Sequence, residues 1–163
     1  MSALPASGAA GHLQLMPMTE RWLDEVSVTE RLAYTHPWSR GNFSDSLRAG
    51  YHAQVLLEDQ QLVGYLVLML GPEEAHLLNI TIAPHRQGQG LGLHLLRQVV
   101  GWSRDQAARL LWLEVRVSNV RARQIYERYG FKTMGLRRNY YPLAPFKRED
   151  AVVMSFALRP EAS

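Results

Sequence analysis

Apolar residues recur along the chain with two spacings, one typical of helices and the other of strands. Apolar positions three or four residues apart predict helices over about 19–34, 91–106 and 120–129. In the first of these helices, the apolar residues Trp22, Leu23, Val26 and Leu32 lie at roughly helical spacing. A short helix that begins at Ser39 or Asn42 is expected to end at Ala49, because the following Gly50 is typical of helix ends.

Segments rich in Val, Leu, Ile and Tyr lie between these helices and predict strands. Three of them follow one another with short connections, as in an antiparallel meander, at His52–Leu57, Leu62–Leu70 and Ala75–Ile82. Four more are expected at His12–Met16, Leu110–Val117, Phe131–Arg138 and Ala151–Leu158. The third meander strand, helix 91–106 and the next strand form a β-α-β unit, whose two strands should be parallel. The pattern predicts a mixed α/β (α+β) fold, in which a central, largely antiparallel sheet of six to seven strands carries about four helices on both faces.

Length and composition predict one compact domain. The chain has 163 residues, of which 47% are apolar and 20% are charged, and it contains no cysteine. Disulfides, thiolate zinc sites and cysteine nucleophiles are therefore excluded. We expect the domain to span 12–160 and the small, Gly- and Ala-rich residues 1–11 to be disordered. The six histidines show no metal-ligand spacing, so no metal is expected.

Targeting signals and charge bear on location and partners. The first 19 residues contain no Lys or Arg, unlike a signal peptide, and no apolar run is long enough to cross a membrane, so a cytoplasmic location is expected. The formal net charge of +3 is unevenly distributed, since residues 1–80 hold four basic against nine acidic side chains and residues 81–163 hold fourteen against six. The basic half indicates an anionic partner, either a phosphate-rich cofactor or nucleic acid, and the acidic half indicates a basic substrate.

A glycine-rich segment, Gln87-Gly88-Gln89-Gly90-Leu91-Gly92, lies between the third meander strand and the helix that follows. Glycines at alternate positions let backbone amides approach a ligand, and with the helix N-terminus they form an anion site suited to a pyrophosphate. The same glycines are equally expected in a tight turn that binds nothing. Their spacing fits neither the dinucleotide-binding fingerprint nor the P-loop.

Gln87, Gly90 and Gly92 match the Gln/Arg-x-x-Gly-x-Gly/Ala pattern of the GNAT N-acetyltransferase family, which the chain resembles over roughly residues 12–158. Within that family, five further segments resemble the ribosomal-protein-alanine N-acetyltransferases. These segments are His36–Ser39, Leu111–Asn119, Ile125–Phe131, Arg137–Pro142 and Arg148–Ala151. The loop near Leu143–Lys147 matches least clearly, and residues 1–11 do not match.

The resemblance implies that acetyl-CoA is the cosubstrate. In this family the pyrophosphate lies on the glycine loop, and the pantetheine arm pairs with the edge of the preceding strand. By resemblance, Ile80, Thr81 and Ile82 would line the arm, while Asn119 would reach the cofactor from the next helix. The pyrophosphate would be held by the loop residues Gln87, Gly88, Gln89, Gly90, Leu91, Gly92 and Leu93.

Glu114 and Tyr126 are the candidate catalytic residues for direct attack of an amine on the thioester. Glu114 alternates with Trp112 and Arg116 on one strand face, where an apolar neighbour would raise the pKa of the carboxyl and Arg116 would lower it. It would act as the base, directly or through water, or else it is an ordinary strand carboxylate paired with an arginine. Tyr126 would act as the acid toward the leaving thiolate, or else it is a core residue of its helix.

The resemblance implies that the acceptor is the N-terminal alanine of a small-subunit ribosomal protein, whose basic terminus the acidic half of the chain would attract. At pH 7 an α-amine with a pKa of about 8 is roughly one-tenth neutral, whereas a lysine with a pKa of about 10.4 is almost entirely charged. Tyr140 and Tyr141, expected in a loop before Pro142, would either wall the peptide entrance or cap the sheet. Neither nucleic acid nor a membrane is required, and a monomer is favoured.

Two other functions fit the sequence. An enzyme with the same fold and cofactor residues would act on a lysine side chain, another protein terminus or a small amine. Alternatively, the chain is a non-catalytic RNA- or ribosome-binding module whose phosphate contacts come from Arg121, Arg123, Arg128, Arg137 and Arg138. Such a module would need neither Glu114 nor Tyr126, so these two side chains separate the alternatives.

Overall fold

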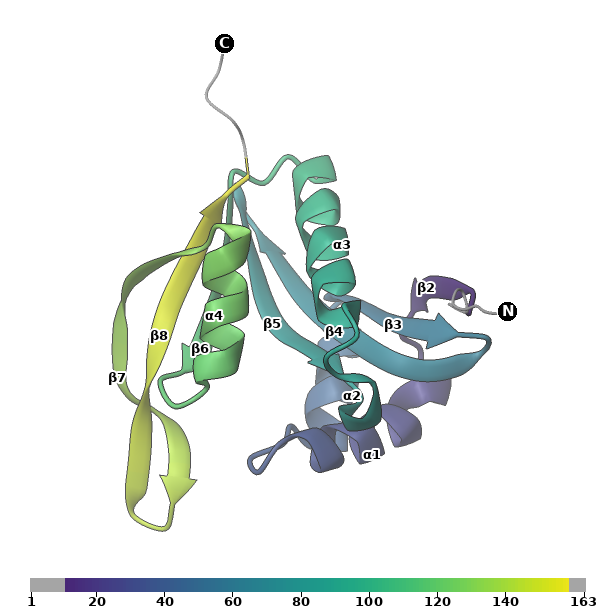
Figure 1. Cartoon of the computed structure of the whole chain (residues 1–163), viewed down its shortest axis with the longest axis horizontal. Helices are drawn as coiled ribbons and strands as arrows, with labels where there is room; N and C mark the ends of the chain where they lie inside the picture. Colours follow the sequence, from purple (N-terminus) through teal and green to yellow (C-terminus); the bar gives the residue numbers. More distant parts are fainter. Residues whose placement is uncertain (1–10, 159–163) are drawn as a thin grey trace. The chain divides into compact units, whose positions relative to one another are not determined.

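The computed structural model describes residues 11–158, so the expectation of disorder over 1–11 lies, apart from Gly11, outside the described residues. In chain order the elements are β2 (Leu13–Pro17), the 3₁₀ helix η1 (Glu20–Trp22), α1 (Leu23–Ala33), α2 (Arg40–Arg48), β3 (His52–Glu58), β4 (Gln61–Gly71), β5 (Glu74–Ile82), the 3₁₀ helix η2 (Pro84–Arg86), α3 (Leu91–Asp105), β6 (Leu110–Arg116), α4 (Val120–Tyr129), β7 (Lys132–Ala144) and β8 (Lys147–Ala157) (Figure 1). Of the described helices, none has the length and apolar content needed to cross a membrane.

Within residues 11–158, seven strands form one sheet in the order β2-β3-β4-β5-β6-β8-β7. Strands β5 and β6 are parallel, and their register pairs Glu74–Leu77 with Leu110–Leu113. The pairs β2–β3, β6–β8 and β7–β8 are antiparallel. The predicted fold class is therefore confirmed for the part of the chain that the structure describes, which has a mixed and largely antiparallel sheet with four α-helices, and the parallel β-α-β unit is confirmed as well.

The described chain divides into two compact units. The first contains residues up to 67 together with 79–95, and the second contains 68–78 together with residues from 96 onward. Strands β4 and β5 and helix α3 each contribute residues to both units. The expected domain span of 12–160 stays a prediction.

The core of the first unit contains side chains from α1, α2, β3 and β4. Leu23 and Val26 of α1 are buried, and Phe43 of α2 meets Tyr65 of β4 edge-to-face, with ring centroids 5.7 Å apart. Leu32, whose spacing is also roughly helical, is instead 73% exposed. The reason is that Leu32 follows Leu23 by nine residues, which places it about 180° around the helix.

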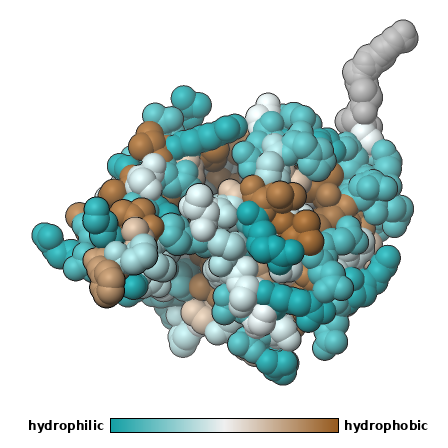
Figure 2. Space-filling model, turned by 90° about the horizontal axis from the view of Figure 1, so that it is seen from below, coloured by the Kyte–Doolittle hydropathy of each residue, from teal (hydrophilic) through white to brown (hydrophobic). Residues whose placement is uncertain are grey.

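Apolar side chains also remain on the surface. Figure 2 shows hydrophobic side chains interspersed with hydrophilic ones on the face seen from below. In the second unit, β7 exposes Met134 and Leu136, and Phe146, in the turn between β7 and β8, is fully exposed. Single exposed apolar residues are common on soluble domains, so this pattern alone defines no binding face.

The last two strands are much longer than the sequence pattern predicted. Tyr140 and Tyr141 lie within β7, which corrects the expectation that they belong to a loop. Pro142 is compatible with this strand because β7 is at the edge of the sheet, where a missing N–H costs no ladder hydrogen bond. The register shifts between Arg137 and Tyr141, where Asn139 has a φ of +52° and donates its N–H to Asp150 Oδ1 at 2.8 Å.

Helix α4 has the predicted bounds because both of its ends are capped locally. Asn119 accepts the N–H of Ala122 at 3.2 Å, and Gly130 ends the helix with a φ of +126°. The helix packs on β8 through Tyr129 and Phe156, whose ring centroids are 5.2 Å apart.

The end of α4 gives a stability prediction. A Cβ at Gly130 would lie 3.0 Å from Phe156 Cε1, and the φ of +126° disfavours any L side chain. We expect Gly130→Ala to lower the free energy of unfolding by about 1–3 kcal/mol, measured by urea denaturation. The control is Gly101→Ala within α3, where nothing lies within 4 Å of the added Cβ, and this change should be neutral or stabilise by up to about 1 kcal/mol. Equal effects of the two changes would contradict this account.

Candidate active site

In the first unit, the glycine-rich loop presents open backbone next to the start of α3. Gly88 and Gly90 both adopt left-handed backbone, with φ of +79° and +86°. Nothing lies within 4 Å of a Cβ built at Gly90, so the space beside this backbone is open. The first N–H groups of a helix have no partner within the helix, and α3 begins at Leu91. The amides of Leu91, Gly92 and Leu93 therefore fit an anion such as a pyrophosphate.

Side chains next to the loop brace it. Gln87 donates its side-chain N–H to the carbonyl of Ile82 at 3.0 Å, so this predicted pyrophosphate residue holds the loop against the end of β5. Arg86 donates to Gln89 Oε1 at 2.9 Å and also pairs with Glu58. The hydrogen bond from Arg86 lowers the pKa of the Glu58 carboxyl, although desolvation acts in the opposite direction.

The end of β5 offers one edge of its backbone. Ala83 donates its N–H to Val63 of β4 at 2.9 Å, and backbone polar groups alternate along a strand, so Ile80 and Ile82 direct theirs away from β4. This is the geometry that a strand-like ligand needs. The carbonyl of Ile80 accepts a hydrogen bond from Tyr34 Oη at 3.2 Å. The side chain of Thr81 is buried and hydrogen-bonded to Tyr34, and by the same alternation its backbone groups face β4, so neither is directed at a ligand.

A buried carboxylate orders the same unit, and sequence reasoning missed it. Glu30 is 2% exposed and accepts hydrogen bonds from Tyr65 Oη at 2.7 Å, Trp38 N at 3.0 Å and Asn79 Nδ2 at 3.3 Å. These bonds fix the loop before α2 and the strands β4 and β5. Desolvation beside this charge raises the pKa of Tyr34 to about 12. The available signal was the spacing, because Glu30 follows the buried Val26 by four residues on α1.

In the second unit, Glu114 lies between two nitrogen donors. His76 Nε2 is 2.9 Å from Oε1 and Arg137 Nε is 2.8 Å from Oε2, while the Glu114 side chain is 7% exposed. His76 pairs with Trp112 across the β5–β6 ladder, and Glu114 lies two residues further along β6 on the same face. His76 was not identified from the sequence, because only the parallel register brings it to Glu114.

The surroundings of Glu114 determine its charge. Desolvation by burial raises the pKa of the carboxyl, but the His76 hydrogen bond, the electrostatic attraction of His76 and Arg137 and a hydrogen bond from Tyr140 together bring it below its ordinary value. Glu114 is therefore ionised at neutral pH. Arg116, which the sequence suggested as the lowering charge, is instead paired with Glu149 Oε1 at 2.9 Å.

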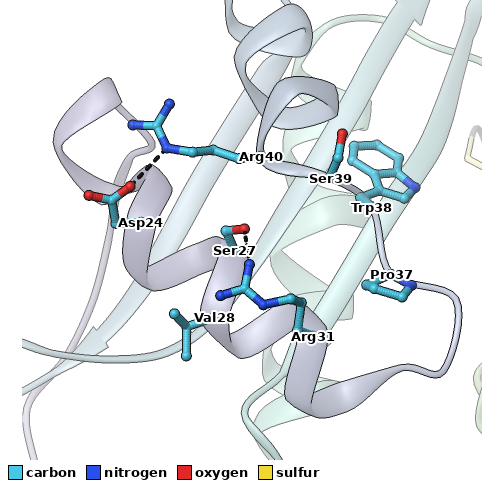
Figure 3. Close-up of a pocket in the computed structure, with 8 residues that line it drawn as sticks. All are labelled: Asp24, Ser27, Val28, Arg31, Pro37, Trp38, Ser39 and Arg40. Atoms are coloured by element: carbon cyan, nitrogen blue, oxygen red, sulfur yellow. Dashed lines mark hydrogen bonds and ion pairs between the residues drawn. The ribbon is translucent and has the colours of Figure 1, made fainter.

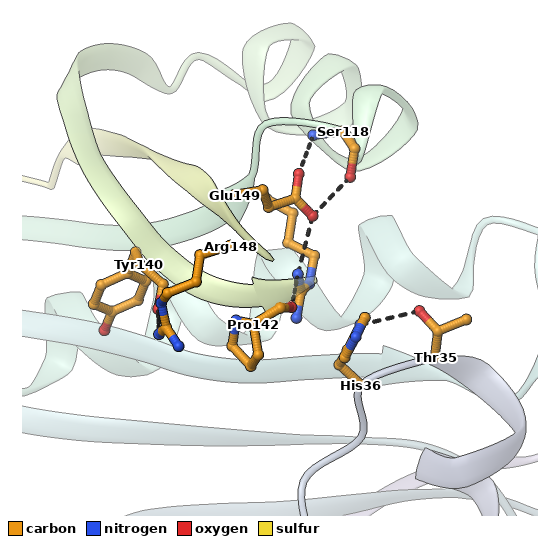
Figure 4. Close-up of polar contacts among 8 residues, drawn as sticks. Thr35, His36, Ser118, Tyr140, Pro142, Arg148 and Glu149 are labelled. Carbon is orange, nitrogen blue, oxygen red and sulfur yellow. Dashed lines mark hydrogen bonds and ion pairs between the residues drawn. The ribbon is translucent and has the colours of Figure 1, made fainter. Parts of the chain in front are cut away.

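The Glu149 carboxylate organises the end of β6 (Figure 4). It accepts hydrogen bonds from Arg116 and from the Ser118 backbone N–H and hydroxyl, at 2.9, 3.1 and 3.0 Å. Burial raises the pKa of Glu149, but these hydrogen bonds lower it below its ordinary value. Figure 4 also shows Arg148, which donates to the Tyr140 carbonyl at 2.8 Å.

The two tyrosines proposed for the substrate have different contacts. Tyr140 is 40% exposed, and burial beside Glu114 raises the pKa of its hydroxyl. The ring of Tyr141 lies 4.5 Å from the guanidinium carbon of Arg116. Tyr140 thus reaches the Glu114 carboxylate, whereas Tyr141 packs on the Arg116–Glu149 pair.

The remaining predicted site residues are Asn119, the N-cap of α4, and Tyr126 within α4. Asn119, expected to reach the cofactor, uses its side chain to cap α4. Tyr126, the expected acid, is partly exposed and lies 5.5 Å from Phe131 between ring centroids. The second unit therefore contains Glu114, Asn119, Tyr126, Tyr140 and Tyr141, and the first contains 80–82 and 87–93.

A groove of about 550 Å³ occurs elsewhere in the first unit (Figure 3). It is lined by Asp24, Ser27, Val28, Arg31, Pro37, Trp38, Ser39 and Arg40. Arg40 pairs with Asp24 at 2.8 Å and Arg31 donates to Ser27 at 2.9 Å, so the charged lining is engaged internally. None of the predicted site residues lines this groove. Over residues 11–158, no cluster of three or more His, Cys, Asp or Glu is arranged to hold a metal ion.

Comparison with known proteins identifies the family of the chain. The family model described as the acetyltransferase (GNAT) family matches residues 16–131. The chain is 39% identical over 126 residues to the [Ribosomal protein bS18]-alanine N-acetyltransferase of Haemophilus influenzae, covering 77% of this chain and 86% of that protein. The chain belongs to the acetyltransferase (GNAT) family, whose enzymes use acetyl-CoA.

Two solved structures share the fold. The crystal structure of the ribosomal-protein-S18-alanine N-acetyltransferase from Escherichia coli has a TM-score of 0.84 and 30% identity, and covers 93% of this chain and 97% of that one. Arabidopsis thaliana Naa50, in complex with the bisubstrate analogue CoA-Ac-MVNAL, has a TM-score of 0.76 and 19% identity, and covers 89% of this chain and 98% of that one.

The glycine loop gives a prediction about cofactor affinity. Gly90→Ala places a Cβ on left-handed backbone and shifts the amides at the start of α3, so we expect the Kd for coenzyme A to rise at least about tenfold. The control is Gly50→Ala, which has the same left-handed backbone at φ +80° and also nothing within 4 Å. Isothermal titration calorimetry should show coenzyme A affinity unchanged in this control. An unchanged Kd in Gly90→Ala would contradict the pyrophosphate site.

Proposed function

We propose that the protein transfers the acetyl group of acetyl-CoA to the α-amine of the N-terminal alanine of a small-subunit ribosomal protein corresponding to bS18. The observation that carries this proposal is the match to the Escherichia coli enzyme of that name, which extends over 93% of this chain at 30% identity. The relative from Haemophilus influenzae, which has the same activity in its name, adds 39% identity over 126 residues.

In the proposed reaction, the neutral amine attacks the acetyl carbonyl carbon, a C–N bond forms, and the C–S bond to coenzyme A breaks. Glu114 takes the proton that the amine loses, directly or through water, and Tyr126 gives its hydroxyl proton to the leaving thiolate. The amides of 87–93 hold the pyrophosphate, and the backbone edge at Ile80 and Ile82 holds the pantetheine arm.

The charge state of Glu114 supports an α-amine rather than a lysine as the acceptor. The pKa of the Glu114 carboxyl lies below its ordinary value, whereas the pKa of an α-amine is about 8. Proton transfer from a free ammonium to this carboxylate is therefore uphill by more than about 4 kcal/mol. Glu114 therefore works on an amine that is already neutral and takes its proton as the C–N bond forms. An α-amine supplies a far larger neutral fraction at pH 7 than a lysine does.

The contacts of the arginines favour an enzyme over an RNA-binding module. Arg137 pairs with Glu114 at 2.8 Å, and Arg123 donates to the Val117 carbonyl at 2.7 Å. Two of the five arginines assigned to RNA are thus engaged within the chain.

The role of Glu114 can be tested by substitution. Glu114→Gln keeps the side-chain volume and removes the proton acceptor, so we expect kcat to fall about 10²–10⁴-fold while the Kd for coenzyme A stays unchanged. The control is Glu73→Gln, which removes an exposed carboxylate whose partner Arg109 lies 3.7 Å away and should leave kcat unaffected. Full turnover in Glu114→Gln would contradict the assignment of Glu114 as the base.

The acceptor can be tested with two basic peptides, one that begins with a free Ala-Arg and one with a blocked terminus and an internal lysine. Intact-mass analysis after incubation with acetyl-CoA should show one acetyl increment on the free terminus only. Acetylation of the lysine alone would keep the family and overturn the acceptor. If neither peptide reacts while coenzyme A binds, the acceptor proposal fails.

A further inference from the structure

His76 is a buried polar residue that the proposed chemistry leaves without a role. It is 9% exposed, and its ring stacks on Trp112 with centroids 3.6 Å apart and planes 11° from parallel. Its Nε2 lies 2.9 Å from Glu114 Oε1. The stack fixes the plane of the imidazole, and so fixes the direction from which Nε2 approaches the carboxylate.

The second ring nitrogen, Nδ1, limits the role that His76 can have. Nδ1 is buried and has no hydrogen-bond partner among the described residues. A buried N–H without an acceptor is costly, so the proton of a neutral ring belongs on Nε2, where Glu114 accepts it. A proton relay would need a second partner at Nδ1. His76 is therefore suited to holding Glu114 and not to passing its proton onward.

The contact of Arg137 with Glu114 explains why the orientation of the Glu114 carboxylate must be fixed. Its guanidinium donates to Oε2 at 2.8 Å, and an arginine readily binds both oxygens of a carboxylate with its planar fork. With Oε1 accepting the hydrogen bond from His76, that two-oxygen pairing is prevented, and the remaining lone pair of Oε1 keeps one direction. Without His76, Arg137 would capture both oxygens of Glu114.

We propose that His76 is a positioning residue for the acetyl transfer, which fixes the Glu114 carboxylate by donating Nε2–H to Oε1 and keeps Arg137 from pairing with both carboxylate oxygens. This inference rests on the proposed role of Glu114 as the base. The other groups facing Glu114 are Tyr140 and Arg137 of β7, with Tyr141 and its Arg116–Glu149 pair further along.

Two substitutions at His76 separate a hydrogen-bonding role from a packing role, because the two roles predict opposite orders of kcat for the two variants. His76→Gln places an amide N–H near the position of Nε2 and loses the aromatic stack, whereas His76→Phe keeps an aromatic ring on Trp112 and loses the donor. We expect His76→Gln to keep kcat within about threefold of the parent and His76→Phe to lower it about 10- to 100-fold. The KM for acetyl-CoA should stay within about twofold in both variants, since the loop residues are untouched.

The pH profile of kcat provides a second readout. Loss of the His76 donor removes a contact that favours the ionised carboxylate, so the lowest part of the acidic limb, which reports Glu114 and lies below the part set by the acceptor amine, should move to higher pH in His76→Phe. The limb should not move in His76→Gln. His76→Asn, whose amide is too short to replace Nε2, should behave like His76→Phe, and it serves in its place if the phenylalanine variant does not fold in a thermal unfolding assay.

The outcomes also separate this inference from the proposed function. In a Glu114→Gln background, His76→Phe should cause no further loss of kcat, because the group that it positions is gone. If Glu114→Gln loses turnover but His76→Phe keeps full kcat, or if His76→Gln is the more damaged variant, the positioning role is overturned and the base assignment stands. If Glu114→Gln keeps full turnover, the base assignment itself fails, and the inference fails with it.

Discussion

The second unit is organised around one electrostatic requirement, the compensation of the Glu114 charge in a largely desolvated position on β6. Two strands meet this requirement, since β5 supplies His76 and β7 supplies Arg137. The pairing is possible only because the sheet places β5 and β8 on either side of β6, with β7 beyond β8. The same contacts that make the charge tolerable also keep the carboxyl ionised, so the fold and the chemistry depend on one set of side chains.

In the first unit, a second buried carboxylate is surrounded by neutral donors. Glu30 is surrounded by a phenol, a backbone amide and a side-chain amide. Neutral donors satisfy the lone pairs of the Glu30 carboxylate without an opposite charge. Their hydrogen bonds connect the loop before α2 to β4 and β5. The cluster presents no acid–base group to solvent. The difference in partners is what makes Glu114 the better candidate for catalysis.

Some of the basic residues in the second half of the chain make ion pairs and hydrogen bonds within the chain. Arg116 and Arg137 pair with carboxylates, and Arg104 and Arg148 donate to backbone carbonyls. Charge counting alone would have assigned these side chains to an anionic partner. The anion site that the geometry supports is made of backbone amides at the start of α3, which carry no formal charge.

Local signals in the sequence determined much of the fold. Asn119 and Gly130 set the bounds of α4, the glycine spacing marked the loop before α3, and the order strand, helix, strand required the parallel β5–β6 pair. Motif resemblance singled out Glu114. The tertiary structure decided which groups surround that carboxylate, because His76 is 38 positions away in the sequence and Arg137 reaches it from β7. It also decided that Tyr140 and Tyr141 belong to a strand, since a bulge at Asn139 and an edge position accommodate Pro142. Spacing and propensity act over a few residues, whereas strand register, burial and charge pairing are fixed only when distant segments meet.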